Sequence, residues 1–121
     1  MKFLAVDDSS TMRKIVSLAL KGAGHEVTEA EHGRDALAKL AGASFDGIIL
    51  DINMPEMNGL EFLTERKKIP AIAKIPVIVL TTQDESGMKD QAMALGANGF
   101  LGKPFQKEQL LAAVKSLVGA Y

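Results

Sequence analysis

The sequence lacks three things that would each point to a particular class of protein. It has no cysteine, which excludes a disulfide framework and a thiolate metal site. It has no run of about 18 apolar residues and no charged-then-apolar leader, so neither membrane insertion nor export is expected. It has no excess of one charge, since 14 Lys and Arg face 15 Asp and Glu, and this balance offers no basic field for nucleic acid. We therefore expect a cytoplasmic protein with no nucleic-acid partner.

What is present is an ordinary globular composition in a chain of one-domain length. Hydrophobic residues make up 47% of the 121 residues, enough for a single core. No linker or low-complexity segment divides the sequence. Residues 1–121 are expected to form one domain.

Short apolar runs alternate with helical patterns along the whole chain. Runs that are apolar on both faces predict strands of a parallel sheet covered by helices on each side. The predicted strands are 2–7, 25–29, 47–51, 77–82 and 98–102, and the predicted helices are 10–24 (with Ser10 as N-cap), 34–41, 59–68, 86–96 and 107–118. The fold class is therefore α/β, a doubly wound five-stranded parallel sheet of flavodoxin-like order 2-1-3-4-5.

Polar residues follow the strands at the edge of the sheet where ligands bind in such folds. Asp7 and Asp8 end the first strand and Asp51 ends the third, which should be its neighbour. Two unit charges about 4 Å apart repel by roughly 4 kcal/mol at an effective dielectric of 20. Protonation of one carboxylate or binding of a divalent cation such as Mg²⁺ would relieve this repulsion.

Each of these residues also has an ordinary structural interpretation. Asp7 and Asp8 suit the N-terminus of the following helix, Thr81 is a normal strand residue, and Lys103 alone resembles any surface lysine. Only the set is specific. A carboxylate nucleophile, a divalent cation and a fixed ammonium group are the parts needed to accept a phosphoryl group, and the Thr81 hydroxyl could donate a hydrogen bond to it.

Four segments carry a resemblance to a known family. They are "VDDSSTMRKIV", "ILDINMPEMNGLEFL", "PVIVLTT" and "GANGFLGKPF". Together they resemble the response-regulator receiver domain of the single-domain chemotaxis (CheY) type, over essentially the whole chain. Receiver domains are themselves a standard example of the 2-1-3-4-5 strand order.

The resemblance implies a role for each residue of the set. It makes Asp51 the phosphoacceptor, held with Asp8 and the backbone carbonyl of Asn53 around Mg²⁺, while Asp7 acts through water. It implies that Thr81 and Lys103 contact the phosphoryl group, and that the Lys103-Pro104 peptide is cis.

Phe100 falls where the family carries its aromatic switch residue. The chemotaxis type has Tyr there, an acidic residue at the position of Gln83 and Trp at the position of Ile52. These three differences bear on which output partner is bound and on how fast the phosphoryl group is lost. When Thr81 turns towards the phosphoryl group, the Phe100 ring is expected to move inward and to alter a partner-binding surface over 86–118. Because Phe lacks a hydroxyl, a ring already inward without phosphate is the alternative.

The resemblance also implies partners. A histidine kinase donates the phosphoryl group, a downstream protein such as the flagellar motor switch receives the signal, and a phosphatase is a further candidate. The process would be chemotaxis or motility signalling. The protein would not be an enzyme beyond phosphoryl transfer onto and off its own Asp51.

Three other functions compete with this interpretation. A phosphatase of the haloacid dehalogenase type wants an Asp two residues after its nucleophile, where this chain has Asn53, and a cap insertion. A flavodoxin-type carrier wants a phosphate loop that "DDSS" would repel. A degenerate receiver acting only as a scaffold is disfavoured by the intact acidic set.

His25 and His32 are expected at the surface or a strand edge, and 65–68 at a solvated helix end.

Overall fold

The apolar runs form one parallel sheet in the computed structural model, which describes residues 1–51, 59–81, 86–102 and 105–118. The strand order is β2-β1-β3-β4-β5, and every pairing is parallel, as predicted. The strands are β1 (Lys2–Val6), β2 (Glu26–Ala30), β3 (Gly47–Asp51), β4 (Val77–Thr81) and β5 (Gly99–Gly102). The helices are α1 (Ser10–Gly22), α2 (Gly33–Gly42), α3 (Gly59–Lys67), α4 (Ser86–Ala94) and α5 (Lys107–Val118).

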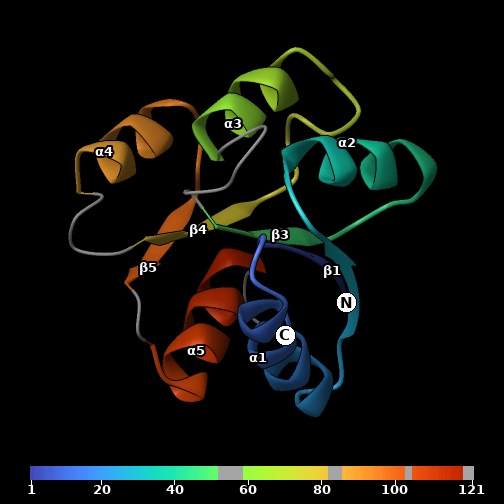
Figure 1. Cartoon of the computed structure of the whole chain (residues 1–121), viewed down its shortest axis with the longest axis vertical. Coiled ribbons are helices and arrows are strands. Elements are labelled where there is room, and N and C mark those ends of the chain that lie inside the picture. Colours follow the sequence, from blue (N-terminus) through green and yellow to red (C-terminus); the bar gives the residue numbers. More distant parts are fainter. Residues whose placement is uncertain (52–58, 82–85, 103–104, 119–121) are drawn as a thin grey trace.

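The helices cover both faces of the sheet, with α2, α3 and α4 on one side and α1 and α5 on the other (Figure 1). Each inner strand supplies both layers, because successive side chains point to opposite faces. In β3, Ile48 and Leu50 join the core under α2 and α3, while Ile49 joins the core under α1 and α5. This double burial explains why the strands are apolar throughout.

The N-cap of helix α1 differs by one residue from the prediction. Its N-cap is Ser9 rather than Ser10, because the Ser9 side chain accepts a hydrogen bond from the backbone N–H of Met12 at 3.2 Å. The buried face of α1 is formed by Val16, Ser17, Ala19 and Leu20, whereas Ile15 is 48% exposed.

The expectation of a solvated end for 65–68 is wrong for Arg66. This residue is buried, and its guanidinium donates to the carbonyl of Ile75 at 2.5 Å, which ties the end of α3 to the segment before β4. Burial lowers the pKa of Arg66 from its usual range. A long side chain can fold back to a carbonyl distant in sequence, and residue type alone does not reveal this.

None of the helices among the described residues is both long enough and apolar enough to cross a membrane.

His25 lies immediately before the edge strand β2, and it is buried. Its ring meets Phe3 edge-on, with the centroids 5.0 Å apart, and Nδ1 lies 3.3 Å from the N-terminal amine. Desolvation and the amine's charge lower the pKa of His25, against a weaker opposing effect of Asp46. The native state therefore favours the neutral ring.

This burial predicts a pH dependence of stability. Above about pH 7 the ring is neutral in both the folded and the unfolded chain, and it has no pH-dependent effect. As the pH falls through about 6.5, the unfolded chain binds a proton that the native ring resists, so the free energy of unfolding should fall. Urea melts of wild type and His25→Gln between pH 7.5 and 5 measure the effect. The variant should lose part of this slope, and equal slopes would contradict the assignment.

Candidate functional site

The ends of β1 and β3 bring three carboxylates together. Val6 pairs with Leu50 in the register of these neighbouring strands, so the residues that follow, Asp7 and Asp51, come to the same edge of the sheet. Asp8 comes next in the chain. One carboxylate oxygen from each of the three lies within 4.8 Å of the others, as the sequence predicts.

The cluster is buried on one side and open on the other. Asp7 and Asp51 are only 3% and 4% exposed, whereas Asp8 is exposed. Negative charges placed this close together with little water around them repel one another, and carboxylate oxygens are the ligands that a hard divalent cation prefers. The donor set therefore fits a divalent metal ion.

Hydrogen bonds fix both the backbone and the side chain of Asp7. Its N–H donates to the carbonyl of Ala30 at 3.1 Å, extending the pairing of β1 with β2 by one residue. Its carboxylate Oδ1 accepts from the N–H of Ser9 at 2.9 Å, next to the N-terminus of α1. The start of α1 thus helps to orient one member of the cluster.

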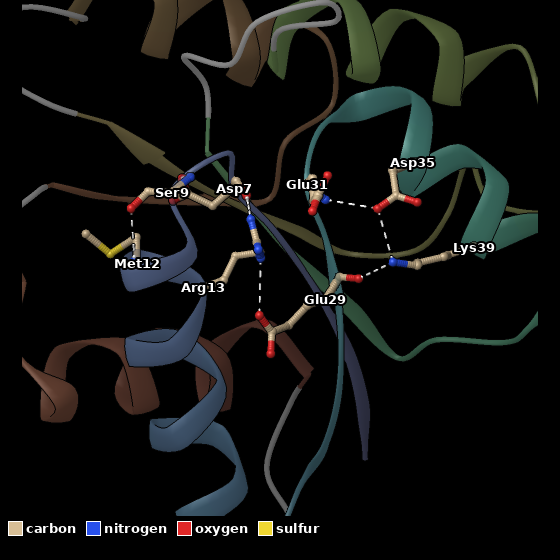
Figure 2. A network of polar contacts seen from close by, with 8 residues as sticks. All are labelled: Asp7, Ser9, Met12, Arg13, Glu29, Glu31, Asp35 and Lys39. Atoms are coloured by element: carbon tan, nitrogen blue, oxygen red, sulfur yellow. Dashed lines mark hydrogen bonds and ion pairs between the residues drawn. The ribbon is translucent and has the colours of Figure 1, made fainter.

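Arg13 also contacts Asp7, although the sequence did not predict a role for it at this site. Its Nη1 donates to the backbone carbonyl of Asp7 at 2.7 Å, and its Nε donates to the carboxylate of Glu29 on β2 at 3.2 Å (Figure 2). One signal in the sequence could have pointed to it. A cation near the N-terminus of a helix is unfavourable with respect to the helix dipole, so it needs a local partner.

The remaining predicted site residues are only partly within the described chain. The backbone of Thr81 ends β4, one residue after Leu80, which pairs with Asp51. Asn53, Lys103 and Pro104 lie outside the described residues, as do Thr82, Gln83 and Ile52.

Phe100 lies on β5, opposite Val79, and its side chain is 45% exposed. The ring therefore points outward, and the alternative of a ring already inward is not what the structure has. Beside it is a cavity of about 370 Å³, lined by Ile78, Met93, Asn98, Gly99, Phe100, Ala113 and Ser116. These residues come from β4, α4, β5, α5 and the connection before β5.

The doubly wound sheet with acidic residues at its switch point agrees with the family that the sequence matches. Residues 3–115 match the response regulator receiver domain, and the chain belongs to this family. Receiver domains are signalling regulators rather than a class of enzymes; they take phosphoryl groups from histidine kinases and act on downstream targets.

Individual relatives match over nearly their full length. The chain is 40% identical to the chemotaxis protein CheY1 of Helicobacter pylori, over 98% of each chain. It is 36% identical to the protein PilG of Pseudomonas aeruginosa, over 100% of this chain and 90% of that one. The solved structure of the chemotaxis protein CheY4 of Vibrio cholerae superposes with a TM-score of 0.90 at 44% identity, covering 96% of this chain and 97% of that one.

Proposed function

We propose that this chain is a response regulator that accepts a phosphoryl group on Asp51, in chemotaxis or motility signalling, and that residues 1–121 act as one receiver domain. The observation that carries the proposal is the cluster of Asp7, Asp8 and Asp51 at the carboxyl ends of two adjacent strands. The relatives named chemotaxis proteins support the process. A cytoplasmic location would be consistent with it.

The cluster fits Mg²⁺ because it offers carboxylate oxygens, and this ion takes one or two carboxylates while keeping several waters. In the proposal, Asp8, Asp51 and the carbonyl of Asn53 hold the ion and Asp7 acts through water. When bound, Mg²⁺ supplies positive charge that offsets the charge of the carboxylates and of the incoming phosphoryl oxygens.

Asp51 is the nucleophile in this proposal. One of its carboxylate oxygens forms a bond to phosphorus as the bond between phosphorus and the kinase histidine nitrogen breaks, giving an acyl phosphate. The ammonium of Lys103 and the hydroxyl of Thr81 contact the phosphoryl oxygens. Magnesium-dependent incorporation of one phosphoryl group from a small-molecule phosphodonor tests the proposal.

The signal is proposed to leave through α4, β5 and α5. Phe100 is exposed beside a cavity, and its strand pairs with the end of β4, where Thr81 lies. A hydroxyl drawn towards the phosphoryl group would leave room for the ring to turn inward, biasing a two-state element. The resulting surface over 86–118 would bind the downstream protein, with the flagellar motor switch as one candidate, and a phosphatase would reset it.

This switch predicts a change in the environment of Phe100. Adding beryllofluoride, a phosphoryl mimic, to the magnesium-loaded protein should shift the fluorine NMR signal of fluorophenylalanine at position 100, because an exposed ring becomes buried. Backbone shifts across 86–118 should change with it. The buried rings of Phe3 and Phe45 provide internal references in the same sample. If Phe100 and 86–118 keep the same signals in both states, the coupled switch is wrong.

Two alternatives from the sequence lose their support. The phosphatase and the flavodoxin-type carrier are different protein families from the one that matches here. A scaffold without phosphorylation remains disfavoured, since the three carboxylates are close enough together to hold a metal ion.

A further inference from the structure

The side chain of Arg13 connects three elements at the edge of the acidic cluster. It starts on α1, contacts the end of β1 through the Asp7 carbonyl, and contacts β2 through Glu29. Figure 2 shows the guanidinium between these two acceptors. The side chain is 12% exposed, and that of Glu29 is 37% exposed, so this ion pair is shielded from solvent on the Arg13 side. Shielded pairs with directed hydrogen bonds hold a side chain more firmly than exposed ones.

The acceptor of Arg13 is the backbone carbonyl of Asp7, the residue that follows β1. The carbonyl of Asp7 belongs to the same planar peptide unit as the N–H of Asp8. A hydrogen bond of 2.7 Å to this carbonyl therefore fixes the orientation of the peptide that joins two of the three clustered carboxylates. The N–H of Asp7 is already fixed by Ala30. Arg13 thus restrains the one connection on which the position of Asp8 relative to Asp7 depends.

The partner of Arg13 is itself anchored. Glu29 accepts from Arg13 through its side chain and from Lys39 through its backbone carbonyl, the latter at 2.5 Å. Lys39 also contacts Asp35 at 3.1 Å, and Asp35 accepts from the N–H of Glu31 at 3.0 Å (Figure 2). These contacts fix the carboxyl end of β2 to α2. Arg13 therefore contacts a Glu29 whose backbone is itself hydrogen-bonded to α2.

We propose that Arg13 is a positioning residue for the metal site: through the Asp7 carbonyl it sets the arrangement of Asp7 and Asp8 that a divalent cation requires. The inference rests on the proposed function, since it assumes that the cluster binds Mg²⁺. Arg13 is not a ligand, and its effect passes through the backbone. The forked guanidinium matters because it reaches two acceptors at once, which the single ammonium group of a lysine does not reproduce in the same geometry.

The test compares Mg²⁺ affinity with stability in four proteins. Arg13→Met removes the contact, and Arg13→Lys keeps the charge but loses the fork. Lys14→Met is the matched control, because Lys14 is the next residue of α1, is exposed, and its loss changes the net charge equally. Chemical-shift titration with Mg²⁺ gives the affinity at a temperature where every variant is folded. Thermal melts in chelator give the stability without metal.

Both Arg13 variants should bind Mg²⁺ about tenfold more weakly than wild type, in the range known for residues that orient metal ligands. Lys14→Met should stay within about twofold. Weaker Mg²⁺ binding by Arg13→Lys would show that the geometry of the guanidinium matters, and not only its charge. If Arg13→Met does not fold, Arg13→Lys decides alone.

Two results would overturn the inference, and they differ. If wild type binds Mg²⁺ but both Arg13 variants bind it equally well, with or without a lower melting temperature, Arg13 has a merely structural role and the proposed function stands. If wild type shows no Mg²⁺ binding at all, the proposed metal site falls and this inference falls with it.

Discussion

Asp51→Asn should abolish the addition of a phosphoryl group by a small-molecule phosphodonor in Mg²⁺. Wild type should gain one adduct of about 80 Da, and the variant none, measured by intact-protein mass spectrometry. An amide oxygen is a poor nucleophile, whereas a carboxylate oxygen can form the acyl phosphate. The substitution preserves the shape of the side chain, which matters because Asp51 is buried at the end of an entirely buried strand.

The same variant should be at least as stable as wild type in chelator. Replacing Asp51 by a neutral amide removes one of three clustered negative charges, and the repulsion among them decreases. Loss of the adduct then cannot be attributed to unfolding. Asp90→Asn is a matched control on α4, where the carboxylate is exposed, and it should be phosphorylated like wild type.

The chemistry of the adduct identifies the acceptor. An acyl phosphate on Asp51 should be lost in alkali or hydroxylamine, whereas a phosphate ester on Ser9 or Thr81 should survive hydroxylamine. An adduct that persists in Asp51→Asn would place the acceptor elsewhere and refute the assignment.

The sheet and the acidic cluster were predictable because both depend on short-range pattern and on topology. Apolar runs such as 47–51 indicate strands buried on both faces, and parallel strands with helical crossovers have few possible orders. Once β1 and β3 are neighbours, Asp7 and Asp51 must end at the same edge. Element boundaries were less certain, as the change from Ser10 to Ser9 at the start of α1 illustrates.

The long basic side chains were not predictable in the same way. Arg13 and Arg66 both donate to backbone carbonyls, of Asp7 and Ile75, and every residue carries such a carbonyl. Nothing in the residue type at position 7 or 75 distinguishes it as an acceptor. These contacts depend on how the helices pack on the sheet, which the periodicity of the sequence does not specify. The outward position of Phe100 likewise depends on the space around β5.

Asp8→Ala should have opposite effects on stability with and without Mg²⁺. In wild type, Mg²⁺ should raise the melting temperature, because binding to the native state alone stabilises it by mass action. The variant loses one carboxylate of the cluster, so its Mg²⁺ affinity should fall by about a hundredfold and most of this rise should disappear. In chelator, however, it should melt at or above the wild-type temperature, since Asp8 no longer repels the buried Asp7 and Asp51.

The change in melting temperature caused by Asp8→Ala is expected to differ in sign between Mg²⁺ and chelator, and this makes the experiment specific for the cluster. An ordinary loss of packing would lower the melting temperature in both conditions, and Asp8 is exposed, so little packing is lost. Asp90→Ala serves as the control for removing one acidic charge from the surface, and it should respond to Mg²⁺ as wild type does. Wild-type protein that melts higher in chelator than in Mg²⁺, or an Asp8→Ala variant that binds the ion as tightly as wild type, would mean that these three carboxylates do not form the metal site.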